Sequence, residues 1–90
     1  MNKVIYKYPL KMQALQNVVL PKQADVLTVA YRYDKLVLWA MVNPDAALKE
    51  HRGIEILCTG QPLTDRERTY ISTVQVMNGM VYHIFEIEPI

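Results

Sequence analysis

The sequence predicts a mostly β domain: a small antiparallel sandwich or barrel of about seven short strands with at most one or two short helical turns. Strand-type alternation recurs in nearly every segment, and no apolar run at helical spacing exceeds about two turns. Proline, glycine and asparagine residues separate the alternating segments. With 90 residues, 51% of them apolar, the chain is expected to form one domain over residues 1–90.

The expected strands follow one another at residues 3–8, 16–20, 25–33, 36–42, 52–59, 70–77 and 80–88. Asp34-Lys35 has hairpin spacing, and Asn78-Gly79 is typical of a two-residue type I′ turn. The strand 36–42 is apolar on both faces, which predicts a central position. Residues 46–51 could form one helical turn, and the charged segment 63–69 reads as an exposed short helix or turn.

Composition narrows the function classes. The net charge of +1 gives no long-range attraction for nucleic acid, although a local basic patch remains open. The single cysteine, Cys58, excludes an internal disulfide and a multi-thiolate metal site, and fits a cytoplasmic location. The apolar run 36–42 is far shorter than the ~20 residues that cross a bilayer, so no membrane partner is expected. A domain this small buries little surface alone, which favours a homo-oligomer.

Catalytic candidates are few. Cys58 and His83 are the minimum for a thiolate–imidazole pair, but Cys58 stands among apolar residues, where a buried inert thiol is the common case. His83 alternates with apolar residues and reads as a hydrogen-bonded, partly buried side chain. Glu86 and Glu88 share a strand face, where acids usually serve solubility. No phosphate-binding glycine loop occurs. The sequence therefore predicts a protein that is not an enzyme and has neither metal nor cofactor.

Binding candidates centre on the turn after the fifth strand. There Thr59, Gly60 and Gln61 could offer backbone amides and a hydroxyl to an anion, although a plain structural turn is the more common case. Arg52 begins the same strand and would supply charge. Trp39 is expected to pack in the core rather than stack on a ligand. The candidate ligand-binding residues are Arg52, Thr59, Gly60, Gln61, Trp39 and His83.

Four segments together resemble a family of small phage and prophage proteins of about this length. They are residues 4–10 (VIYKYPL), 38–44 (LWAMVNP), 59–62 (TGQP) and 81–86 (VYHIFE). The family pattern has an aromatic-Lys-Tyr start, a Trp-Ala-hydrophobic-Val-Asp/Asn-Pro segment, a Gly-Thr-Gly turn and a His-hydrophobic-Phe-Glu end. Cys58 stands where that turn has its first glycine. The resemblance implies a phage setting and brings no activity with it.

These observations lead to one functional expectation and its alternatives. We expect a phage-encoded, non-catalytic protein in the host cytoplasm that counters antiviral defence by sequestering a small phosphate-bearing, nucleotide-type immune signal. The first alternative is a protein–protein interaction module that inhibits a host protein directly. A Cys58/His83 enzyme ranks lower. Nucleic-acid binding also ranks lower, because the overall charge is balanced.

Overall fold

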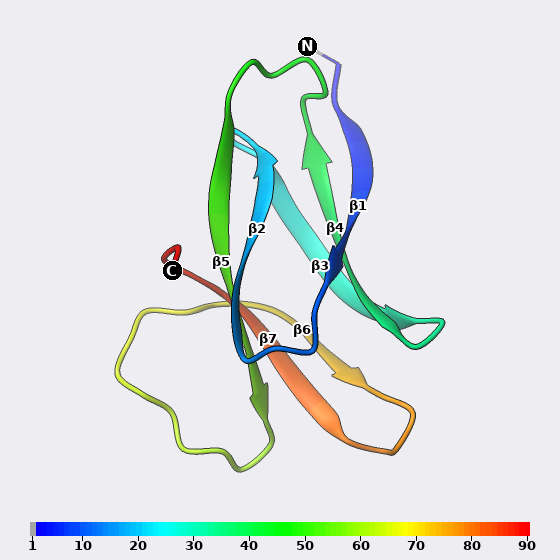
Figure 1. The fold of residues 1–90 in the computed structure, drawn as a ribbon, viewed down its shortest axis with the longest axis vertical. Helices are drawn as coiled ribbons and strands as arrows, with labels where there is room; N and C mark the ends of the chain where they lie inside the picture. Colours follow the sequence, from blue (N-terminus) through cyan, green and yellow to red (C-terminus); the bar gives the residue numbers. More distant parts are fainter. Residues whose placement is uncertain (1) are drawn as a thin grey trace.

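Seven antiparallel strands form two sheets in the computed structural model, which describes residues 2–90 (Figure 1). The strands are β1 (Val4–Leu10), β2 (Leu15–Pro21), β3 (Asp25–Arg32), β4 (Lys35–Val42), β5 (Lys49–Cys58), β6 (Thr69–Gln75) and β7 (Val81–Ile87). One sheet has the order β1-β4-β3 and the other the order β2-β5-β7-β6. The described chain contains no helix, and hence no helix that could span a membrane.

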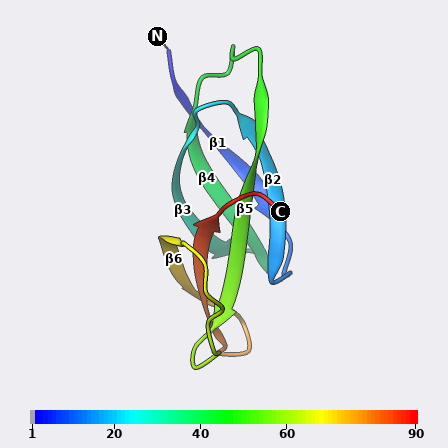
Figure 2. The ribbon, with the colours of Figure 1, turned by 90° about the vertical axis from the view of Figure 1, so that its left-hand side faces the viewer.

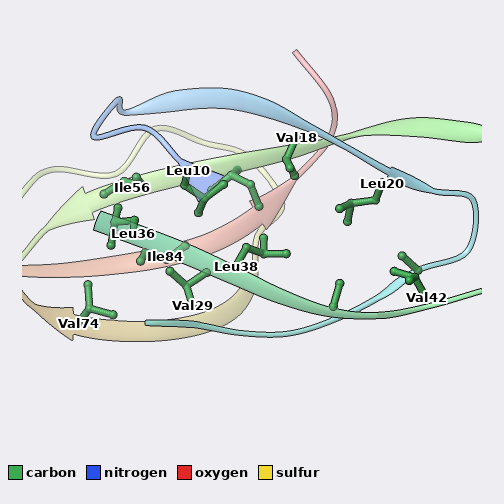
Figure 3. Close-up of a cluster of buried hydrophobic side chains, with 13 residues drawn as sticks. Leu10, Val18, Leu20, Val29, Leu36, Leu38, Val42, Ile56, Val74 and Ile84 are labelled. Carbon is green, nitrogen blue, oxygen red and sulfur yellow. The ribbon is translucent and has the colours of Figure 1, made fainter. Parts of the chain in front are cut away.

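The two sheets pack face to face, as the edge-on view shows (Figure 2). Alternate residues of each central strand point into the space between them, and Figure 3 shows their apolar side chains meeting there. Leu36 and Leu38 of β4, Ile54 of β5 and Ile84 of β7 are almost fully buried. Burying each such side chain stabilises the fold by roughly 1.5–3 kcal/mol. This cluster is the core of a small β sandwich, which confirms the predicted fold class.

Edge strands β3 and β6 meet across the sandwich at two irregular positions. The ladder register shifts between Val26 and Thr28 of β3, and between Tyr70 and Ser72 of β6. The Ser72 hydroxyl accepts a hydrogen bond from the Val29 amide at 2.8 Å and pairs with the Thr28 hydroxyl at 2.8 Å. A buried serine of one sheet thus supplies a hydrogen-bond partner for a backbone amide of the other.

The segment expected as a helical turn partly extends the fifth strand instead. Lys49 and His51 pair with Pro21 and Val19 of β2, so β5 begins three residues earlier than the alternation indicated. Cross-strand pairing outweighs the weak local preference of a short polar segment. The prediction that residues 36–42 form a central strand is confirmed, because β4 lies between β1 and β3.

Both hairpin turns differ from the sequence-based predictions. Tyr33 and Asp34 both have positive φ, 51° and 64°, between the paired residues Arg32 and Lys35. This is type I′ geometry without glycine, one residue earlier than expected.

The Asn78-Gly79 prediction of a two-residue turn is wrong. Only Gly79 has positive φ, at 84°, and the Val76 amide donates to the Met80 carbonyl at 2.9 Å. Three residues therefore form the loop, with Gly79 in the left-handed position that closes such loops.

The outer face of the four-stranded sheet is covered by the chain's own irregular segments. Glu55 and Leu57 point away from the core yet are each only 5% exposed. Residues 59–68 form a wide loop beside β5 in Figure 1, and Figure 2 shows the segment Glu88–Ile90 passing β5 and ending beside β2. Asn17 of β2 holds that segment by two hydrogen bonds of 2.8 Å to the backbone of Ile90.

Candidate functional site

The outer face of the three-stranded sheet carries a hollow of about 360 Å³. We call this surface the Trp39 face. Its lining residues come from β1, β3, β4 and the hairpin between β3 and β4, at the lower right of Figure 1. They are Lys7, Arg32, Tyr33, Lys35, Val37 and Trp39.

Strand register brings these residues together. Leu36, Leu38 and Ala40 of β4 point into the core, so Val37 and Trp39, which alternate with them, point outward. Lys7 of β1 stands directly opposite Trp39. Cross-strand neighbours on one face lie about 5 Å apart at Cβ, so the lysine stem flanks the indole ring. The surface is therefore an aromatic ring and an apolar strip beside a cation.

The charge of the Trp39 face is uncompensated. Lys7, Arg32 and Lys35 form no ion pair with any carboxylate of residues 2–90, and no acid lines the hollow. The nearest acid in sequence, Asp34, is bonded at 3.4 Å to the hydroxyl of Tyr31. Because Tyr31 stands opposite the buried Leu36, this contact holds the carboxylate toward the inner side of the hairpin. The net charge of the whole chain is only +1, yet the Trp39 face carries these three cations without acid partners.

The expectation that Trp39 packs in the core is wrong. The ring is half-buried on the outer face and is absent from the buried cluster between the sheets. The sequence suggested otherwise because β4 is apolar on both faces, a pattern typical of strands covered on both sides. Here only one side is covered, and an amphipathic indole is left where it can stack on a planar group.

The turn Thr59–Gln61 lies on the other sheet and uses its polar groups internally. The Gln61 amide donates to the Cys58 carbonyl at 3.1 Å, and the Gln61 side chain accepts from the Cys58 amide at 3.0 Å. Gly60 has the positive φ, 84°, that the turn requires. The Thr59 hydroxyl lies 2.7 Å from Nε2 of His83. These groups stabilise the turn, which leaves little for an anion.

His83 occupies the centre of a short polar chain. Its Nδ1 lies 3.1 Å from the hydroxyl of Thr73, which in turn lies 2.8 Å from the hydroxyl of Tyr70. Both ring nitrogens therefore face hydroxyl groups, and none of these partners is a carboxylate that could orient the ring as in a catalytic triad. The predicted hydrogen-bonded, partly buried histidine is confirmed.

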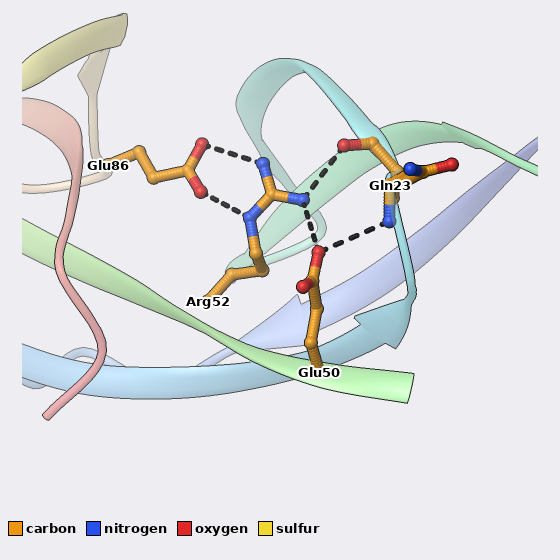
Figure 4. A network of polar contacts seen from close by, with 5 residues as sticks. Gln23, Glu50, Arg52 and Glu86 are labelled. Atoms are coloured by element: carbon orange, nitrogen blue, oxygen red, sulfur yellow. Dashed lines mark hydrogen bonds and ion pairs between the residues drawn. The ribbon is translucent and has the colours of Figure 1, made fainter. Parts of the chain in front are cut away.

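Arg52 is separated from that turn by the length of β5 and is held by acids (Figure 4). Its guanidinium forms a two-pronged pair with Glu86, with Nη2 3.1 Å from the carboxylate. Nη1 donates to the Ala24 carbonyl at 2.8 Å and contacts Glu50 at 3.4 Å. The hydrogen bond to Glu86 raises the pKa of Arg52 above its ordinary value. This arginine ties β5 to β7 and to the segment before β3.

Cys58 and His83 lie on opposite faces of the four-stranded sheet. His83 stands opposite Leu57 in the ladder, whereas Cys58 stands opposite Tyr82, which packs against the core. Adjacent residues of a strand point to opposite sides. The pleat therefore separates the thiol from the imidazole that the enzyme alternative requires.

Sequence reasoning missed the cations of the Trp39 face and the acids on the other sheet. Lys7, Arg32 and Lys35 are far apart along the chain, and only the β1-β4-β3 register joins them. The buried Glu55 pairs with Arg68 at 2.6 Å across the loop 59–68. One signal was readable: a lone acid between Ile54 and Ile56 in an otherwise apolar run demands a cationic partner.

Residues 1–89 match the model of a family described as a domain of unknown function, DUF7352, and the chain belongs to that family. No curated protein and no solved structure matches the chain. The Trp39 face is therefore interpreted from its own chemistry.

Proposed function

We propose that this chain is a non-catalytic binding protein that captures a phosphate-bearing ligand with a planar base on the Trp39 face. One observation carries the proposal: a half-buried indole shares a hollow with Lys7, Arg32 and Lys35, and no carboxylate lines it. A flat ring offers stacking to a base, and unpaired cations offer charge-assisted hydrogen bonds to phosphate. The volume of about 360 Å³ is within the range of small-ligand sites.

The biological setting is part of the same proposal. The resemblance of the sequence to phage proteins supports a phage-encoded protein that acts in the host cytoplasm and counters defence by sequestering a nucleotide-type signal. Self-association also belongs to it, supported by apolar side chains exposed on edge strands β1 and β2, Ile5 at 58% and Val19 at 47%. Equilibrium sedimentation at increasing protein concentration measures that self-association directly.

Trp39 is the only tryptophan of the chain, so its fluorescence reports on the proposed site. We expect nucleoside di- and triphosphates to quench the emission saturably, because a base stacked on the indole contacts it directly. The double variant Arg32→Ala/Lys35→Ala should weaken the binding by about tenfold or more. Removal of two exposed lysines at the end of the other sheet, in Lys22→Ala/Lys49→Ala, changes the net charge equally and should leave the affinity within about twofold.

Unsaturable quenching by all nucleotides, equal in the two double variants, would contradict the proposal. Circular dichroism and urea unfolding of both variants exclude loss of fold as the cause, since all four side chains are exposed.

A second candidate function is docking of a host protein, and a different surface favours it. Met12, Met77 and Met80 are 55%, 75% and 42% exposed, and Met12 and Met77 line a hollow of about 240 Å³ with Tyr31 and Tyr82. Flexible thioether side chains suit adaptable protein interfaces. A purified host partner should lose affinity for the Met12→Glu/Met77→Glu variant but not for Arg32→Ala/Lys35→Ala.

A further inference from the structure

The Trp39 face has the form of a platform for a polymer, an inference that rests on the proposed function and narrows its ligand class. We infer that the face binds single-stranded nucleic acid, reading several phosphates along β4, in preference to a free nucleotide. Three features carry this inference: the spacing of the cations, the openness of the face, and the geometry of the hairpin at its end.

The cations form two separate points along the strand. Lys7 lies beside Trp39, whereas Arg32 and Lys35 face each other at the start of β4. Trp39 is four positions after Lys35, which is roughly 13 Å at the rise of a β strand. One phosphate group cannot contact both points. A strand whose backbone follows β4 can place one phosphate near each, with a base on the ring between them.

The face is open along its length. Every residue that lines the hollow belongs to β1, β3, β4 or their hairpin. The wide loop 59–68 and the segment Glu88–Ile90 lie on the other sheet, where Arg68 and Asn17 hold them. Small-ligand sites usually enclose most of their ligand. Open sheet faces that carry aromatic and basic side chains are, by contrast, a common way to bind single strands.

The hairpin supplies a second aromatic surface. Tyr33 is 90% exposed, and the Arg32 guanidinium lies 5.9 Å from the centre of its ring. A bulky residue with a φ of 51° is unusual, because the left-handed region costs about 1–2 kcal/mol for residues with a Cβ. The turn thus holds a ring outward at the rim, next to two cations, at a cost in stability.

The charge pattern limits the footprint of the polymer to one half of the face. At the far end of the face, Lys3 is neutralised by Asp25 at 3.7 Å, and Met41 lies opposite Ile5 and Asp25. The cations that have no acid partner are confined to the half between Trp39 and the hairpin. We therefore expect a short footprint of a few nucleotides, with bases stacked on Trp39 and Tyr33 and phosphates near the three cations.

The test compares ligands of increasing length on the full chain. Fluorescence anisotropy of labelled oligo-dT and oligo-U of 2, 4, 8 and 16 nucleotides gives the affinities, with Trp39 quenching as the second signal. The affinity per binding site should rise at least tenfold from a mononucleotide to the oligonucleotide length that covers the face. Longer oligonucleotides should give no further rise. Two phosphate contacts, one at each point, predict a slope of about −1.4 in log K against log salt concentration.

Matched variants locate the contacts. Tyr33→Ala and Trp39→Ala should each lower the affinity for the 8-mer by about fivefold or more, because each removes one stacking surface. Arg32→Ala/Lys35→Ala should flatten the salt slope by about 0.7 or more, whereas Lys22→Ala/Lys49→Ala should not change it. Because Tyr33 is exposed, its loss tests the site without disturbing the core.

The outcomes separate this inference from the proposed function. A free nucleotide that binds as tightly as the 8-mer would overturn the polymer and leave nucleotide capture standing. Equal affinity for a duplex of the same length would also overturn it, because paired bases cannot stack on the rings. If neither nucleotides nor oligonucleotides bind, both the polymer inference and the proposed nucleotide capture are contradicted. A preference between the DNA and RNA series identifies which polymer is bound.

Discussion

The two sheets of this sandwich differ in what lies on their outer faces. On the four-stranded sheet, the loop 59–68 and the segment Glu88–Ile90 cover the centre, and Arg66 and Arg68 contact the buried Glu55. No segment of the chain covers the three-stranded sheet, and three cations without acid partners share a hollow with the half-buried Trp39. Charged side chains on the covered sheet form ion pairs that stabilise the fold. Those on the bare sheet have no acid partner and are available to bind a ligand.

The largest expected effect concerns the covered sheet. The Arg68→Ala variant leaves the carboxylate of Glu55, whose side chain is 7% exposed, without its 2.6 Å partner. An uncompensated buried charge should lower the free energy of unfolding by about 3 kcal/mol or more. Urea unfolding measures the loss.

Arg66→Ala is the matched control for that prediction. Arg66 lies 3.9 Å from the same carboxylate, and its side chain is 34% exposed. Its removal should cost less than about 1 kcal/mol. Similar losses for the two variants would mean that the loop does not hold Glu55 in the way described.

Leu38 and Trp39 test the contrast between inner and outer faces within one strand. Leu38→Ala removes a side chain that is 0% exposed and should cost about 3 kcal/mol. Trp39→Ala should cost less than about 1.5 kcal/mol although the side chain is larger, because its outer side has no packing partner. If both variants were equally destabilised, the Trp39 face would be covered in solution, and sedimentation would then show the covering copy.

Gly53 tests how closely the chain covers the four-stranded sheet. A Cβ at this position would clash with the carbonyl oxygen of Glu88 and lie 2.8 Å from that of Ile87. Gly53→Ala should therefore displace the C-terminal segment and cost about 2 kcal/mol in unfolding experiments.

Gly60→Ala provides the comparison. A Cβ there meets nothing within 4 Å, but the φ of 84° is strained for alanine, so the cost should be about 1 kcal/mol. Only Gly53→Ala should also increase proteolysis after the segment is released from Asn17.

The smallest expected effect is a gain in stability at the edge of the Trp39 face. Asp34→Gly relieves a φ of 64° and should raise the free energy of unfolding by about 0.5–1 kcal/mol, since the turn type favours glycine. Asp45→Gly, at a turn position without positive φ, should give no gain. A loss of stability in Asp34→Gly would show that the carboxylate contact with Tyr31 matters more than the backbone.

The sequence by itself determined the β class, the approximate strands and the central position of β4. Period-two alternation is a local property, and a strand buried on one face must show it. It also indicated a partly buried, hydrogen-bonded His83. Turn geometry was less readable: Asn78-Gly79 matched a preferred pair, yet the ladder of β6 and β7 sets a longer loop.

Only the tertiary structure decided which face of β4 is bare and which cations surround Trp39. Lys7 and Arg32 are 25 positions apart along the chain (32 − 7 = 25), and strand order, which alternation does not specify, brings them to one surface. Strand order also decides the partner of Arg52, which forms an ion pair with Glu86 of another strand. Local chemistry sets what each residue can do, and the pairing of distant strands sets what it meets.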